Sequence, residues 1–89
     1  MFISFLIANW NSGGLLDECT RSLLAQTHTN FEVIIVDNGS TDGSEHVGAL
    51  EDSRFKLIKL AANAGFSAAN NIAYAQSRGD IIVLLNNDV

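Results

Sequence analysis

Residues 31–43 read FEVIIVDNGSTDG, a nearly continuous apolar run that stops at an aspartate and gives way to turn-forming residues. A strand that is apolar on both faces is typical of a parallel sheet covered on both sides. Asp, Asn, Gly and Ser in succession favour a tight loop. The stretch therefore predicts a buried parallel strand over residues 31–36, with a polar loop at its carboxyl end.

Three further apolar runs, at residues 2–8, 55–60 and 80–85, alternate with helical patterns. The run at residues 55–60 contains Lys56 and Lys59, which predicts an edge strand. Leucines at helical spacing predict a helix that ends near residue 25, and an alanine-rich segment predicts another over residues 67–78. Asp42 and Glu45 are spaced like an N-cap residue and its partner, so a third helix is expected from there to about residue 50. This alternation favours an α/β fold with an open, doubly wound parallel sheet and helices on both faces.

The composition excludes several classes of protein. The 89 residues are 47% hydrophobic and 17% charged, which is typical of one small globular domain. A net charge of −5 has the wrong sign for a nucleic-acid partner. No apolar run is long enough to span a membrane. The single cysteine, Cys19, cannot form an internal disulfide, so a cytoplasmic location is expected.

Polar residues gather where the predicted strands end, and ligands of doubly wound sheets bind at the carboxyl ends of the strands. These residues are Asn9 and Asn11 after the first strand, Asp37 and Asn38 after the second, Asn63 and Gly65 after the third, and Asn86, Asn87 and Asp88 after the fourth. The alternative is a set of ordinary turns, because Asn, Asp and Gly favour turns for their own conformational reasons.

The loops do not match the common phosphate-binding motifs. Residues 39–44 have neither the spacing of a dinucleotide-binding loop nor the lysine of a P-loop. A receiver-like signalling domain is only a distant alternative. Such a domain would place acidic residues after its first strand, where this chain has the amides Asn9 and Asn11.

Five segments together resemble family 2 glycosyltransferases with the GT-A fold, and within that family the rhamnosyltransferase-like members. They are residues 31–43, the IANWN of residues 7–11, the NAGF and AANN of residues 63–66 and 68–71, and the LLNND of residues 84–88. The resemblance covers essentially the whole chain. It implies a four-stranded sheet in the order 3-2-1-4, the N-terminal half of a GT-A fold, with residues 1–89 as a single, incomplete domain.

The resemblance also implies a site for a nucleotide diphospho-sugar donor. Its candidate residues are Ala8, Asn9, Asn11, Asp37, Asn38, Asn63, Gly65, Asn70 and Asn87. Asp37 is similar in place to an aspartate that bonds the nucleotide base, and a carboxylate suits an imide N–H. The metal-binding D-x-D motif of the family reads Asn86-Asn87-Asp88 here, so Asp88 is the candidate ligand of Mg²⁺ or Mn²⁺. Asn86 departs from the motif, because an amide is a neutral ligand.

The implied reaction is transfer of a hexosyl or rhamnosyl group, with inversion, to a hydroxyl of a carbohydrate or lipid-linked acceptor. The catalytic base of the family lies after the metal motif, so no catalytic residue is assigned and the chain is expected to be inactive alone. The apolar fourth strand favours self-association or cover by further chain. Membrane association is expected only as part of a longer protein. The alternative function is a non-catalytic nucleotide-binding or interaction module.

Overall fold

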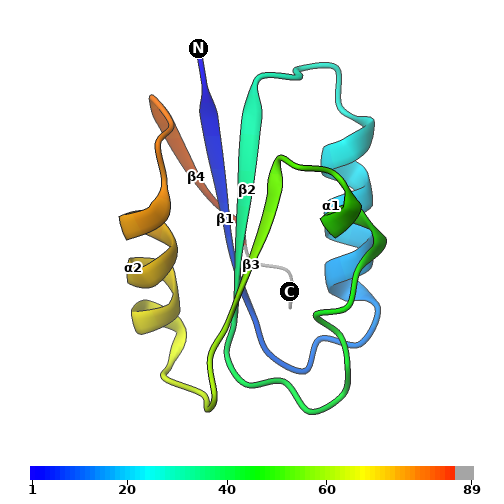
Figure 1. Ribbon diagram of the computed structural model, residues 1–89, viewed down its shortest axis with the longest axis vertical. Helices are drawn as coiled ribbons and strands as arrows, with labels where there is room; N and C mark the ends of the chain where they lie inside the picture. The colour runs from blue at the N-terminus through cyan, green and yellow to red at the C-terminus, as the bar shows by residue number, and fades with distance from the viewer. Residues whose placement is uncertain (86–89) are drawn as a thin grey trace.

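A computed structural model describes residues 1–85, which form a parallel sheet with helices on both faces (Figure 1). The strands are β1 (Ile3–Asn9), β2 (Phe31–Asp37), β3 (Phe55–Lys59) and β4 (Ile81–Leu85). The helices are α1 (Leu15–Ala25), α2 (Phe66–Gln76) and the short 3-10 helix η1 (Gly48–Glu51). The strand order is β3-β2-β1-β4 with every pairing parallel, which confirms the expected fold class and order.

The sheet is covered on both faces because its two central strands are apolar at almost every position. One set of alternate side chains packs under α1 and η1, and the other set packs under α2 (Figure 1). On the α1 face, Phe5, Phe31 and Phe55 form a row of edge-to-face ring contacts at centroid distances of 5.8 and 6.0 Å. On the α2 face, Ala69 and Ala73 are fully buried, so this helix lies close to the sheet.

The predicted helix from Asp42 to about residue 50 is wrong. Asp42 Oδ1 accepts a hydrogen bond from the Ser44 N–H at 2.9 Å, which makes a local turn and caps no helix. Gly43 has a φ of +77°, a left-handed conformation that interrupts helical geometry. Glu45 does not turn back toward Asp42, because its carboxylate pairs with Lys59 of β3 at 2.9 Å. Only the single 3-10 turn of η1 remains.

The other elements agree with the expectations to within two residues. β3 lies at an edge of the sheet, as its lysines predicted, and β4 lies at the opposite edge. None of the helices within the described residues has the length and apolar character needed to cross a membrane.

Candidate functional site

The loops that follow β1, β2 and β3 meet at the carboxyl edge of the sheet, at the bottom of Figure 1. Asn9 is in register with Asp37, and Asp37 is in register with Lys59. The backbone N–H of Asn38 donates to the Asn9 carbonyl at 2.8 Å, and the N–H of Leu60 donates to the Asp37 carbonyl at 2.8 Å. The parallel sheet therefore brings together the polar residues that the sequence places at three strand ends.

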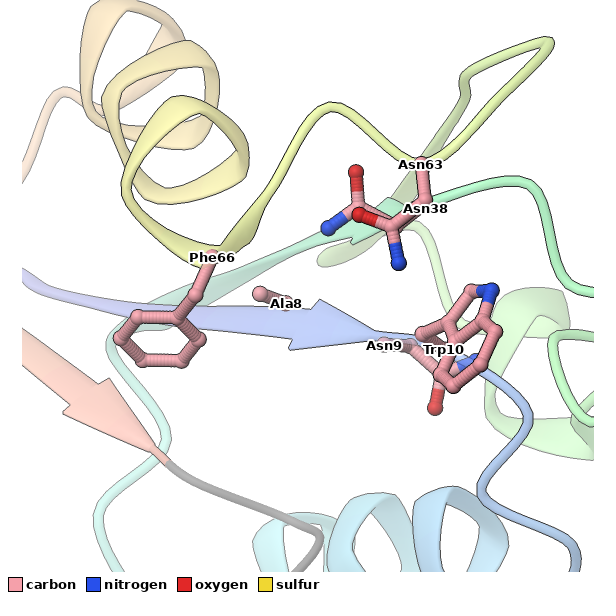
Figure 2. Close-up of a pocket in the computed structure, with 6 residues that line it drawn as sticks. All are labelled: Ala8, Asn9, Trp10, Asn38, Asn63 and Phe66. Carbon is pink, nitrogen blue, oxygen red and sulfur yellow. The ribbon is translucent and has the colours of Figure 1, made fainter.

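A small open cavity of about 150 Å³ lies at this edge (Figure 2). Its lining residues are Ala8, Asn9, Trp10, Asn38, Asn63 and Phe66, none of which carries a charge. Trp10 and Phe66 lie at opposite ends of the cavity in Figure 2, with the amides of Asn38 and Asn63 beside it. The two rings are 53% and 55% exposed. Two exposed rings and two amides suit a neutral, planar, hydrogen-bonding group.

Asp37 lies behind the cavity wall and is completely buried. Its Oδ1 accepts the Asn9 amide N–H at 2.9 Å and the Ser40 hydroxyl at 2.6 Å. Its Oδ2 accepts the backbone N–H of Ser40 at 2.9 Å. Asn9 also donates to Ser44 Oγ at 3.1 Å and accepts the Ser12 hydroxyl at 2.6 Å. In this structure the Asp37 carboxylate therefore orients Asn9 and the loop after β2.

Asn38 fixes the opposite wall by holding the loop between β3 and α2. Its side-chain amide donates to the Gly65 carbonyl at 3.2 Å, and its Oδ1 accepts the Ala64 N–H at 3.1 Å. Asn63 Oδ1 accepts the N–H of Gly65 at 2.7 Å. Gly65 has a φ of +93° and precedes the first turn of α2. These bonds set where Phe66 enters the helix.

Asn11 joins the loop after β1 to the loop after β2. It has a φ of +44°, in the left-handed region that asparagine tolerates better than most residues. Its N–H donates to Ser40 Oγ at 2.9 Å, and its Oδ1 accepts the Thr41 N–H at 2.8 Å. The position of Trp10 is therefore held on both sides, by Asn9 and by Asn11.

Lys59, which is in register with Asp37 at this edge, is committed to another partner. Lys59 pairs with the buried Glu45, and that contact raises the pKa of Lys59 and lowers the pKa of Glu45. Residues 1–85 also contain no group of three His, Cys, Asp or Glu side chains that could hold a metal ion. A phosphate bound here would need a cation from elsewhere.

The structure brings together part of the predicted site. Ala8, Asn9, Asn38 and Asn63 line the cavity, and Gly65 adjoins it through Asn38. Asn70 lies one turn into α2, where its amide donates to the Phe66 carbonyl at 3.2 Å, and it does not line the cavity. Asn86, Asn87 and Asp88 lie outside the described residues. Their roles, and the expected proximity of Asp88 to Asp37, stay predictions.

Sequence reasoning missed the two rings and two of the serines. The pattern of polar residues at the strand ends singles out neither Trp10 nor Phe66, although an aromatic residue directly after a strand and one at a helix start are visible in the sequence. Ser40 and Ser44 looked like ordinary turn residues. Their contacts with Asn9 depend on residues 31 and 35 positions away, which a local pattern does not report.

Residues 4–89 match the model of the family described as glycosyl transferase family 2, so the chain belongs to this family. It is 38% identical to an uncharacterised glycosyltransferase of Nostoc sp., over 99% of this chain and 28% of that protein. It is 32% identical to glycosyltransferase GlyG of Streptococcus pneumoniae, over 97% and 30%. The chain spans between 10% and 36% of the length of such curated relatives.

Solved structures agree with the fold. TarS of S. aureus (residues 1–349) in complex with UDP-GlcNAc superposes with a TM-score of 0.88 at 27% identity, over 99% of this chain and 27% of that one. The mannosyltransferase PcManGT from Pyrobaculum calidifontis, in complex with GDP-Man and Mn²⁺, gives 0.84 at 23% identity, over 97% and 27%. Because the identity to PcManGT is only 23%, this similarity supports the fold and nothing more.

Proposed function

We propose that this chain is the donor-binding part of a glycosyltransferase and that the cavity takes the base of a nucleotide diphospho-sugar. The observation that carries the proposal is the uncharged cavity between Trp10 and Phe66, with the amides of Asn38 and Asn63 at its side. A nucleobase is neutral and planar, stacks on aromatic rings and exchanges hydrogen bonds with amides. The likeness to TarS, which is solved with UDP and with UDP-GlcNAc, supports this choice.

The size of the cavity supports the base as its occupant. Its volume of about 150 Å³ is below the range of roughly 300–1,000 Å³ that is usual for pockets that enclose a whole drug-sized ligand. The cavity therefore takes one part of the donor, and the diphosphate and sugar lie outside it. Asp37 stays a proposed contact of the nucleobase, although it is buried and bonded to Asn9 and Ser40, so a direct contact requires one of these bonds to be exchanged for an N–H of the nucleobase.

We propose that a divalent cation balances the charge of the donor diphosphate. Lys59 is paired with Glu45, and the residues that line the cavity are neutral, so the described edge offers little to balance a diphosphate. Mg²⁺ and Mn²⁺ prefer oxygen ligands and commonly bind through one or two carboxylates together with substrate phosphates. We assign Asp88 as the protein ligand. Such an ion, when bound, neutralises charge that builds on a departing diphosphate.

The reaction that we propose is an inverting transfer of the sugar to a hydroxyl of a carbohydrate or lipid-linked acceptor. A base must remove the proton of that hydroxyl. Asp37 is buried and accepts three hydrogen bonds, so it is not assigned this role. We expect residues 1–89 to bind the donor without transferring its sugar.

Two further proposals concern the surroundings of the chain. The uncharged β4 exposes Ile81 and Leu84 at an edge of the sheet, which favours pairing with another strand. We propose a second copy of this chain as one such partner.

Cys19 is the single cysteine of the sequence and favours a reducing compartment, so we propose a cytoplasmic location for the protein.

Titration calorimetry of the 89-residue chain with UDP, GDP and dTDP, each with and without Mn²⁺, tests the proposed function. We expect binding of at least one nucleotide, tighter with Mn²⁺. Replacing Asp88 with alanine should remove the Mn²⁺-dependent part and leave the rest, whereas Asp17→Ala, on α1, is the matched control and should change neither. Binding that ignores Mn²⁺ would favour the non-catalytic module, and no binding at all would end the proposal.

A further inference from the structure

A buried carboxylate lies at the amino end of the sheet, far along the strands from the candidate site. Glu32 is the second residue of β2 and is only 3% exposed. Its Oε2 accepts the Ser4 hydroxyl of β1 at 2.6 Å and the backbone N–H of Arg78 at 2.7 Å. Ser4 Oγ in turn accepts the N–H of Gly79 at 2.8 Å. Side chains of the two central strands thus bind two consecutive N–H groups of the turn between α2 and β4.

This turn sits directly on β1. A Cβ atom added to Gly79 would lie 2.5 Å from Ser4 Oγ and 2.6 Å from the Ser4 backbone nitrogen, so no larger residue fits without a shift. Asp80 strengthens the same attachment, because its N–H donates to the Phe2 carbonyl at 2.7 Å and its carboxylate accepts the Phe2 N–H at 3.0 Å. The start of β4 is therefore fixed in the register that pairs Ile3 with Ile81.

β4 cannot specify this register through its own pattern. Its sequence is IIVLL, apolar at every position, and a slip by one residue would leave it equally apolar on both faces. Register is normally set by an alternation of apolar and polar residues, and a one-residue slip turns every side chain to the other face. The polar contacts of Glu32 and Ser4 therefore fix the register, which the sequence of β4 does not specify.

The chemistry of Glu32 supports a role in specificity. A buried carboxylate is costly unless it is well bonded, and Oε1 of Glu32 has no hydrogen-bond partner, with Lys56 Nζ 3.7 Å away. Burial alone raises the pKa of Glu32. The hydrogen bonds from Ser4 and Arg78, together with the nearby Lys56, outweigh that effect, so the pKa of Glu32 lies below its usual value. The group stays ionised at neutral pH.

We infer that Glu32 and Ser4 are positioning residues that set the register of β4 and, through it, the metal-dependent part of donor binding. The inference rests on the proposed function. β4 ends at Leu85, which pairs with Ile7 beside the cavity residue Ala8. The base cavity is built from β1, β2 and the loop after β3, whereas the proposed metal ligand follows β4. An error in the register of β4 should therefore weaken the metal-dependent part of donor binding and leave binding of the nucleobase unchanged.

The test compares two ligands on the 89-residue chain, uridine alone and UDP with Mn²⁺. Glu32→Gln keeps the shape of the side chain but places an amide toward Lys56, and Ser4→Ala removes the hydroxyl. We expect each variant to lose about tenfold of UDP–Mn²⁺ affinity, the lower end of the loss found when a direct hydrogen-bond partner of a metal ligand is altered, because these residues act only through the register of β4. Uridine affinity should stay within about twofold, because the cavity does not use β4.

Two controls separate positioning from general loss of stability. Leu23→Ala creates a void under α1, on the opposite face from α2, and should lower stability while both affinities stay unchanged below the unfolding transition. Glu51→Gln alters an exposed carboxylate and should change nothing. Equal losses for uridine and UDP–Mn²⁺ in Glu32→Gln would overturn the inference.

Nuclear magnetic resonance gives a readout that does not depend on the ligand. In the wild type, contacts should join the methyl groups of Leu6 to those of Leu84, and the ring of Phe5 to the methyl groups of Val83, as the register requires. Glu32→Gln and Ser4→Ala should weaken these contacts, or replace them by contacts displaced by one residue, while the contacts between β1 and β2 persist. An unchanged pattern in both variants would overturn the inference even if the wild type binds no nucleotide, in which case the proposed function fails separately.

Discussion

Alanine in place of Gly39 is expected to destabilise the fold by about 2–5 kcal/mol, from left-handed backbone strain together with overpacking. Gly39 has a φ of +80°, and an added Cβ would lie 2.9 Å from Ala62 Cα and within 3.2 Å of the Ala62 nitrogen and carbonyl carbon. Because those neighbours are backbone atoms, no side-chain rotation relieves the contact. Stability of a chain of this length is on the order of 4–13 kcal/mol, so the loss should be large in urea unfolding.

Gly13→Ala is the matched control for this substitution. Gly13 also has a positive φ, +61°, but nothing lies within 4 Å of its added Cβ. Only the backbone strain of about 1–2 kcal/mol should appear. The difference between the two variants measures the close approach of the loop after β2 to the loop after β3. If both variants lose the same stability, these loops do not pack as the structure shows.

The strands were predictable because parallel strands buried on both faces carry their signal in consecutive residues. Residues 31–36 and 2–8 are apolar almost throughout. The observed β2 differs from the prediction by one residue at one end, and β1 by one residue at each end. The lysines of residues 55–60 likewise marked an edge strand correctly. The strand order came from the resemblance to a family, because apolar runs do not state which strand pairs with which.

The helix expected from Asp42 failed because a local cap pattern competed with a contact distant in sequence. Glu45 lies 14 residues before Lys59, yet the sheet brings the two charges to 2.9 Å. Gly43 and Gly48 also weaken a helix in this segment, and only the η1 turn forms. A cap motif is therefore informative only where its acidic partner has no stronger contact available.

The candidate site was predictable as an edge of the sheet and only partly as a set of side chains. Asn9, Asn38 and Asn63 line one cavity, because the end of a strand fixes where the next residues lie. Asp37 lies at the same edge but is buried, with both oxygens bonded within the chain. Burial of a strand-end carboxylate depends on Ser40, Ser44 and Asn9 together, and no single stretch of sequence reports that combination.

Replacing Trp10 with alanine is expected to weaken nucleotide binding by about 5-fold to 150-fold, the equivalent of roughly 1–3 kcal/mol of base stacking. Trp10 lines the cavity and is 53% exposed, so its removal should leave the unfolding transition nearly unchanged. It is also the only tryptophan of the chain, so its fluorescence reports on the cavity directly. Addition of UDP to the wild type should change that fluorescence with the same affinity that calorimetry gives.

Two further variants decide whether the ring itself is responsible. Tyr74 of α2 is 63% exposed and does not line the cavity, so Tyr74→Ala removes a comparable exposed ring and should not alter affinity. Trp10→Phe keeps an aromatic face and should recover most of the lost binding, because stacking needs the face of the ring and not the indole N–H. Unchanged affinity in Trp10→Ala, or an equal loss in Tyr74→Ala, would show that the base does not bind between Trp10 and Phe66.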